Sequence, residues 1–229
     1  MTSPSNWAHE ALAVLVKDLR SEYRTRYAFS AVLLFAVTAL AVVSFSVSPY
    51  SLDADSQAAF VWIVLFFSAM SGLSRSFVRE EEARTAMALR LAAAPEAVYT
   101  GKLLFNMLLQ AAVAAVVIPL FLVLLDVAPA RPDLLVWAAI LGNMALASSS
   151  TIIAAIVSRA NAKGALFAVL AFPVSIPGLS SAIRATTAAI RGAGSATGSA
   201  AVGDLPALAA YSVLMIAVSL LLFDFVWND

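Results

Sequence analysis

Cysteine is absent from the 229-residue chain, and histidine occurs once, at His9. The lack of cysteine excludes disulfides, thiol catalysis, cysteine-ligated metals and covalent haem attachment through Cys-x-x-Cys-His. One histidine rarely makes a ligand set by itself. The phosphate-binding pattern G-x-x-x-x-G-K-[ST] is also missing. The sequence therefore predicts no metal site, no bound cofactor, no ATP-binding loop of that type and no catalytic residue.

Charge is also scarce. Charged residues make up 12% of the chain, hydrophobic residues make up 62%, and the formal net charge is zero. A soluble domain is typically about 25% charged and about 45–50% apolar. The composition therefore predicts a membrane protein, and the zero net charge gives no signal for nucleic-acid binding.

Six apolar runs are long enough to cross a bilayer, which takes about 20 helical residues. Their centres contain no Asp, Glu, Lys, Arg or His, although ion-coupled carriers usually place such residues at membrane depth. We therefore expect an all-α, polytopic membrane protein with one domain over residues 1–229, and a partner that supplies the energy for any transport. The predicted spans cover residues 28–47, 58–78, 102–125, 133–158, 163–183 and 207–227.

Basic residues are distributed unevenly between the two sides of these spans. Eleven lie ahead of the first span, between the second and third spans, or in the 159–163 loop. The opposite side has three: Arg131, Arg184 and Arg191. Because cytoplasmic loops are enriched in Lys and Arg, both termini are predicted to be cytoplasmic. Residues 184–206 would then be periplasmic, with a flexible glycine-rich loop at 192–203.

The first 27 residues are predicted to form an amphipathic helix in the plane of the cytoplasmic interface. Apolar residues recur about every four positions, and basic residues gather near the end of the segment. The alternative is an ordinary solvated helix face ahead of the first span. The residues that characterise this helix are Trp7, Leu15, Leu19, Arg24 and Arg26.

Charge is concentrated in residues 75–102, "RSFVREEEARTAMALRLAAAPEAVYTGK". Good helix formers and the i, i+4 pair Glu80 and Arg84 predict that the second span continues as a helix into the cytoplasm. Pro95 should end this helix and open the next one. The alternative is a solvated loop that only fixes topology. An apolar face with Met and Leu instead favours docking to a partner protein or to the membrane surface.

Pro173 and Pro177 lie in the fifth span and remove two backbone donors. They could form a gate or an outward re-entrant hairpin, or they could be a static kink, and the sequence leaves these alternatives open. Polar residues in the spans, such as Asn106 and Gln110, are better explained by helix packing than by cargo binding.

The chain resembles the ABC-2 type of ABC transporter permease, and more narrowly the haem exporter protein B (CcmB) family of cytochrome c maturation. The segment "RSFVREEEARTAMALRLAAAPEAVYTGKLLFN" is similar to the cytoplasmic segment of that family, and "LAFPVSIPG" is similar to its fifth-span motif. The resemblance covers essentially the whole chain. It departs at residues 83–86, where many members have an acidic residue and a glycine.

The resemblance implies that residues 75–102 form a coupling hairpin that docks a separate ATP-hydrolysing subunit. The chain would be a non-enzymatic permease in the bacterial inner membrane, with haem as cargo and with ATP and Mg in the partner. Other partners implied are haem-handling membrane subunits and a periplasmic haem chaperone. The predicted docking residues are Arg79, Glu80, Glu81, Glu82, Arg84, Thr85, Met87, Leu89, Leu91 and Pro95.

Six spans give half of the usual transport pathway, so a homodimer is expected. Two other functions remain open at this point. One is an ABC-2 permease that exports a lipid, glycan or drug. The other is a membrane scaffold that assembles other subunits without transport.

Overall fold

The structure is a computed structural model that describes residues 4–46, 52–73, 75–82, 84–158, 163–192 and 196–228. These residues are almost entirely helical and include no strand. In chain order the helices are α1 (Pro4–Thr25), α2 (Tyr27–Ser46), α3 (Ala54–Leu73), α4 (Arg75–Glu82), α5 (Ala86–Ala92), α6 (Pro95–Leu124), α7 (Pro132–Val157), α8 (Lys163–Arg191) and α9 (Ala196–Asn228).

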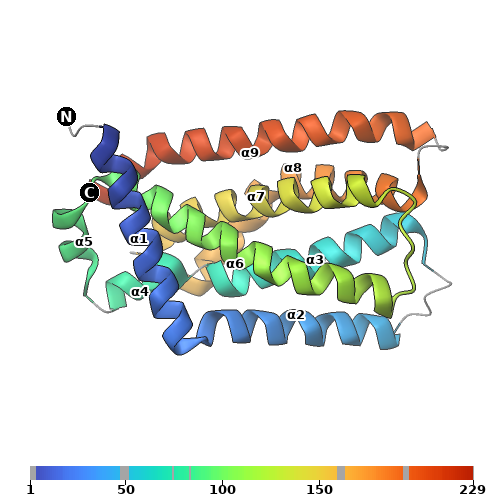
Figure 1. The fold of residues 1–229 in the computed structure, drawn as a ribbon, viewed down its shortest axis with the longest axis horizontal. Helices are drawn as coiled ribbons and strands as arrows, with labels where there is room; N and C mark the ends of the chain where they lie inside the picture. Colours follow the sequence, from blue (N-terminus) through green and yellow to red (C-terminus); the bar gives the residue numbers. More distant parts are fainter. Residues whose placement is uncertain are drawn as a thin grey trace.

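Six helices are long and apolar enough to cross a membrane, namely α2, α3, α6, α7, α8 and α9. Helices satisfy their own backbone groups, which is required where no water is present. They form an elongated bundle, and both termini lie at one end of it with α1, α4 and α5 (Figure 1). We call this the hairpin end and the other the opposite end. The predicted all-α fold with six membrane-spanning helices is confirmed.

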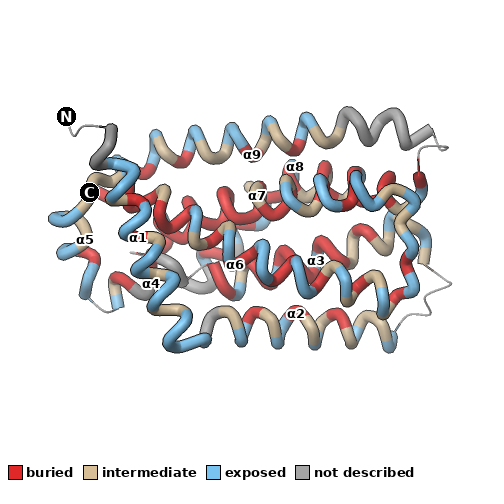
Figure 2. Tube along the Cα trace, in the orientation of Figure 1, coloured by how far each residue is buried: buried red, intermediate tan, exposed pale blue. Residues whose placement is uncertain are grey.

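Helix α7 lies in the middle of the bundle, and α2 and α9 lie at its margins (Figure 2). The Trp62 side chain of α3 is 2% exposed and fills the space beside Gly142 of α7. A Cβ atom at Gly142 would lie 2.0 Å from the Trp62 ring. The indole of Trp62 also donates a 2.9 Å hydrogen bond to Thr186 Oγ1 of α8. One side chain therefore joins three spans.

Helix α1 crosses the bundle instead of running along it (Figure 1). The change of direction occurs at Arg26, which has a φ of 50° and separates α1 from α2. A non-glycine residue in this left-handed region ends a helix because the carbonyl geometry no longer continues the α-helical pattern. Arg26 therefore belongs to a turn, although it was predicted to lie within the helical segment 1–27.

The hairpin segment differs from its prediction in two ways. Helix α4 ends at Glu82, and Arg84 has a φ of 56°, so Glu80 and Arg84 do not form an i, i+4 pair in one helix. Pro95 does open a helix, as predicted, but α6 then continues without interruption through Lys102. The third span is therefore longer than predicted, because Gly101 and Lys102 are compatible with a helix whose neighbours bury them.

The structure narrows the alternatives for the proline segment and differs from the prediction for the outer segment. Helix α8 includes both Pro173 and Pro177 and continues to Arg191, so a re-entrant hairpin is wrong for this segment. The predicted loop at 192–203 is wrong for residues 196–203, which belong to α9; residues 193–195 lie outside the described part. Alanine is the best helix former, and it offsets the glycines in this stretch.

Candidate functional site

At the hairpin end, α1, α4 and α6 meet around the ammonium group of Lys102. This side chain is 1% exposed. Its Nζ atom lies 3.0 Å from Glu80 Oε1 of α4 and 3.1 Å from Asp18 Oδ2 of α1. The ammonium is also 5.4 Å from the centre of the Phe77 ring. A buried charge requires close partners because desolvation is costly, and here the two carboxylate partners come from different helices.

Two further side chains complete this cluster around Glu80. Lys17 of α1 donates to Glu80 Oε1 and lies 3.2 Å from Asp18 Oδ1. Thr85 donates a 2.6 Å hydrogen bond from its hydroxyl to Glu80 Oε2, and its backbone N–H bonds to the Glu80 carbonyl. We call Lys17, Asp18, Glu80, Thr85 and Lys102 the ionic cluster. It connects the hairpin to both α1 and the base of α6.

The electrostatics of Glu80 follow from these neighbours. Burial alone would raise the pKa of its carboxyl group. The Lys102 ammonium and the hydrogen bonds from Lys17 and Thr85 outweigh burial and lower the pKa from its usual 4.5 to about 2. The pKa of Lys17 is raised, because its contacts with Glu80 and Asp18 outweigh its own partial burial. Glu80 is therefore ionised at neutral pH and holds its partners by charge.

The other acidic residues of α1 bind backbone groups at the start of neighbouring helices. Glu10 Oε2 accepts a 3.0 Å hydrogen bond from the N–H of Ala94, the residue before α6. Glu22 Oε1 accepts a 2.8 Å hydrogen bond from the N–H of Phe29 near the start of α2. A carboxylate at such a position satisfies a free donor and complements the helix dipole. All three acids of α1 thus point toward the bundle.

Close packing accompanies these polar contacts where α1 crosses α6. A Cβ atom at Gly101 would lie 2.6 Å from the carbonyl oxygen of Ala11 and 2.7 Å from Val14 Cβ. Glycine is required here because the backbone of α1 approaches α6 directly. The ionic cluster is adjacent, because Asp18 lies one turn after Val14 on α1 and Lys102 directly follows Gly101 on α6.

The hairpin presents apolar side chains on its outer side. Leu91 is 85% exposed and Met87 is 65% exposed. Helix α5 has seven residues, too few to be stable alone in water. The Arg90 guanidinium contacts the Trp227 ring of α9 at 5.1 Å from its centre and so attaches α5 to the bundle.

The predicted docking residues divide into two groups. Glu80 is 8% exposed and belongs to the ionic cluster, with Thr85 bonded to it. The side chain of Arg79 lies outside the described part, and docking by any of these residues stays a prediction. The remaining residues are exposed or half-buried: Glu81, Glu82, Arg84, Met87, Leu89, Leu91 and Pro95.

Within the spans, buried polar groups bond to one another. Asn106 Nδ2 of α6 donates to Thr151 Oγ1 of α7 at 2.8 Å, and Gln110 Nε2 donates to the Leu65 carbonyl of α3 at 3.1 Å. These contacts join helices in the way that was predicted for packing residues. Among the described residues no group of three His, Cys, Asp or Glu side chains could hold a metal.

The proline segment of α8 receives a hydrogen bond from α9. The Tyr211 hydroxyl donates a 2.6 Å hydrogen bond to the carbonyl oxygen of Val174, which lies between Pro173 and Pro177. Gly178 allows this approach, since a Cβ atom there would lie 2.7 Å from Tyr211 Cε1. The hydroxyl thus supplies a donor in a segment where the prolines supply none.

The sequence also matches a known protein family. A family described as CcmB protein matches residues 9–225, which is nearly the whole chain. The chain belongs to the CcmB family. This family is the haem exporter B family of cytochrome c maturation, so the resemblance stated from the sequence is confirmed. No curated protein matches the chain closely enough to add a relative.

Membership of the CcmB family makes this chain a membrane component of haem export, which works with other proteins of cytochrome c maturation. Haem fits as cargo, since it is what the family exports. The match includes the ionic cluster, the hairpin and the proline segment, because all of them lie within residues 9–225.

Sequence reasoning identified Glu80 and Thr85 but missed the rest of the ionic cluster. Lys102 and Lys17 were counted only among the basic residues that indicate topology, and Asp18 was given no role. One signal was present: Lys102 directly precedes an apolar run and follows a glycine, so a helix that includes it must bury it or expose it to lipid.

Proposed function

We propose that this chain is the permease subunit of an ABC transporter complex for haem export, driven by a separate ATPase that docks on the hairpin. The observation that carries this proposal is the exposed apolar surface of Met87 and Leu91 on a short cytoplasmic helix. Exposed leucine and methionine on a helix held away from the spans indicate a protein contact. The ATPase would bind ATP and Mg, and this chain would perform no chemistry.

The ionic cluster supports a route for energy transfer. Force applied to the hairpin by ATP-driven closure would reach Glu80, then Lys102 at the base of α6 and Asp18 of α1. Buried ion pairs resist separation because neither partner can be left unpaired at low cost. The hairpin, α1 and α6 would therefore move together, whether the step drives haem across the membrane or releases a loaded periplasmic chaperone.

The orientation in the membrane, the domain organisation and the assembly of the chain are part of the same proposal. The hairpin end carries most of the basic residues, so it would face the cytoplasm of a bacterium. Both termini would then lie on the cytoplasmic side of the inner membrane. Residues 1–229 would act as one transmembrane domain. The active assembly would contain two copies of the chain, together with haem-handling membrane subunits.

The test is co-purification of the ATPase with a hairpin variant. Leu91→Glu should remove the ATPase from the purified complex and abolish holo-cytochrome c formation, while membrane insertion stays normal. Leu91→Met is the matched control, because it keeps the apolar contact, and it should retain both. Full ATPase recovery and normal holo-cytochrome c with Leu91→Glu would contradict docking at this surface.

A second variant distinguishes docking of the ATPase from transfer of energy to the spans. Glu80→Gln leaves the outer surface of the hairpin unchanged but weakens the ionic cluster. The ATPase should still co-purify, and holo-cytochrome c should fall. A scaffold without transport would instead tolerate this change with no loss of holo-cytochrome c.

A further inference from the structure

The acids and the arginines of helix α1 lie in different settings, while Lys17 joins the acids in the ionic cluster. Its acids, Glu10, Asp18 and Glu22, all bond to neighbouring elements of the bundle. Its arginines, Arg20 and Arg24, are exposed, and neither has an ion-pair partner among the residues that the structure describes. Like charges at i, i+4 on a helix repel each other. Arg20 and Arg24 therefore repel each other, and the acids of the ionic cluster, Asp18 and Glu80, are already paired with Lys17 and Lys102.

These arginines border an open cavity of about 770 Å³ on the surface of α1. Hydroxyl groups lie beside the charges, and the Thr25 hydroxyl donates to the Ser21 carbonyl at 3.1 Å. Guanidinium groups recognise phosphate oxygens well because their donors are planar and paired. Lining residues include Val16, Lys17, Arg20, Ser21, Arg24 and Thr25.

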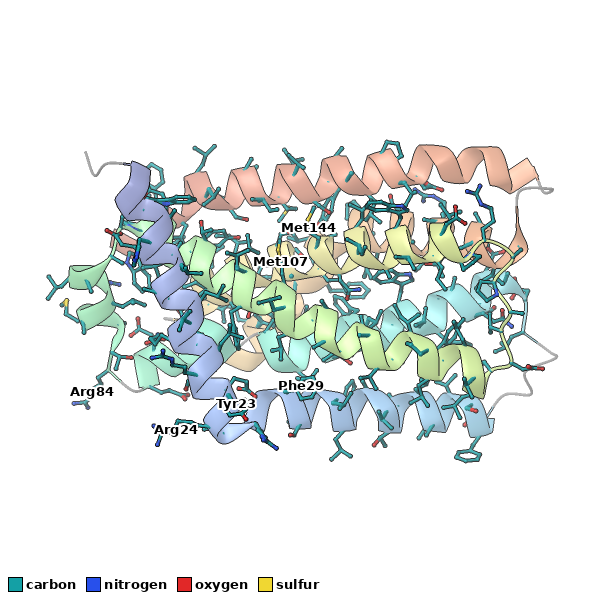
Figure 3. The ribbon with its side chains drawn as sticks, in the orientation of Figure 1. Tyr23, Arg24, Phe29, Arg84, Met107 and Met144 are labelled. Carbon is teal, nitrogen blue, oxygen red and sulfur yellow. The ribbon has the colours of Figure 1, made fainter. Side chains whose placement is uncertain are left out.

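An exposed apolar stripe runs along α1 next to this basic side. Leu12 is 55% exposed, Leu19 is 40% exposed and Tyr23 is 76% exposed, at spacings that place them on one side of the helix. Figure 3 labels Tyr23 beside the start of α2 and Arg24 farther from the spans. Apolar residues at this level would lie against acyl chains, and the arginines would lie at the depth of lipid phosphates.

We propose that the cavity on α1 binds the head-group phosphate of an anionic phospholipid through Arg20 and Arg24. The occupant is a lipid because the basic cavity adjoins the apolar stripe, so one molecule with a phosphate and acyl chains satisfies both. Lys17 lines the cavity and also pairs with Glu80, so the site adjoins the ionic cluster. It does not include Met87 or Leu91 of the hairpin, and it does not depend on the proposed haem-export mechanism. The lipid would hold α1, and with it Asp18 of the ionic cluster, at the membrane surface.

The experiment measures thermal unfolding of the purified full-length chain in neutral detergent with added lipid. Dioleoyl phosphatidylglycerol should raise the unfolding midpoint by several degrees more than dioleoyl phosphatidylcholine does. The Arg20→Gln/Arg24→Gln variant should need about thirtyfold more phosphatidylglycerol for the same rise, given the usual contribution of each basic residue at an anionic surface. The Arg20→Lys/Arg24→Lys variant keeps the charge but loses the paired guanidinium donors, so its response should lie between those of the wild type and the Gln variant.

The control removes the same charge elsewhere. Arg131→Gln/Arg184→Gln at the opposite end should keep the full phosphatidylglycerol response. If the α1 double variant unfolds early even with phosphatidylcholine, each single variant should still show a reduced response. An unchanged phosphatidylglycerol response in all the Gln variants of α1 would overturn the site.

Two other outcomes would also overturn the proposal. Equal protection by glycerol 3-phosphate would indicate a simple anion site with no lipid requirement. Loss of the ATPase from the Gln variants together with a normal phosphatidylglycerol response would assign the basic side of α1 to a protein contact.

Discussion

The two ends of the bundle use the same kinds of ion pair in opposite settings. At the hairpin end, Lys102 is 1% exposed and joins three helices. At the opposite end, Arg184 is 56% exposed and pairs with Asp204, and Arg191 is 36% exposed and pairs with Asp55. Exposed pairs contribute little, whereas removing one partner of a buried pair is costly. The burial of a charged side chain, more than the number of its partners, determines how much stability is lost when it is removed.

The largest effect is expected from Lys102→Met. This change removes the buried cation that Glu80 and Asp18 share and leaves them only the half-exposed Lys17, so it should lower the free energy of unfolding by about 3–5 kcal/mol. Equilibrium unfolding in mixed micelles measures it. Lys17→Met is the matched control, since this lysine has the same two partners but a half-exposed side chain. Equal losses for both variants would break the distinction between buried and exposed pairs.

The next effect is expected from Glu80→Gln, which should cost about 1.5–3 kcal/mol, the usual range for hydrogen bonds to a charged group. The pKa of Glu80 is depressed from 4.5 to about 2 in the folded protein. Its ionised form therefore contributes stability above pH 4.5, and this contribution is lost as the pH falls toward 2.

The pH dependence gives a separate measurement. Between pH 4.5 and 2 the unfolding midpoint should fall more for the wild-type chain than for Glu80→Gln, because only the wild type loses the Glu80 charge. Above pH 5 the difference between the two should stay constant. Parallel curves across the acidic range would show that Glu80 is not held by the ionic cluster.

A smaller loss is expected from Gly101→Ala, which tests whether packing or charge holds α1 on α6. The added Cβ would lie 2.6 Å from the Ala11 carbonyl oxygen, so the backbone of α1 must move. The cost should be about 1–3 kcal/mol, which outweighs the better helix propensity of alanine. Ala112→Val, at an exposed position of α6, is the control and should be close to neutral. A neutral Gly101→Ala would show that α1 is not closely packed there.

The smallest effect is expected from Arg191→Gln at the opposite end. Its pairs with Asp55 and Asp53 are exposed, so the loss should be about 0.2–1 kcal/mol and should shrink further in high salt. Unfolding in low and high salt checks this. A salt-independent loss above about 2 kcal/mol would exceed the range for exposed pairs and would remove the contrast between the ends.

Much of the fold could be predicted from the sequence, because span length and apolar composition are local properties. The six spans, the helix ahead of them and the helix start at Pro95 all follow from such signals. The ionic cluster could not be predicted, because Asp18, Glu80 and Lys102 come together only when three helices pack. The break at Arg84 was also missed, since strong helix formers surround it and only its positive φ reveals the turn.

Because Arg90 of α5 contacts Trp227 at the end of α9, the fluorescence of Trp227 should report on the position of the hairpin. Trp227 is 5% exposed and stacks on Phe223, and a cation lies 5.1 Å from its ring. Indole emission responds both to a nearby charge and to contact with water. If an ATPase moves α5, the guanidinium must leave the ring, and the emission of Trp227 should change in step with each nucleotide state. The chain thus contains its own fluorophore for following turnover in real time, once Trp7 and Trp137 are replaced by phenylalanine and the emission of Trp62, which packing requires, is taken as a constant background.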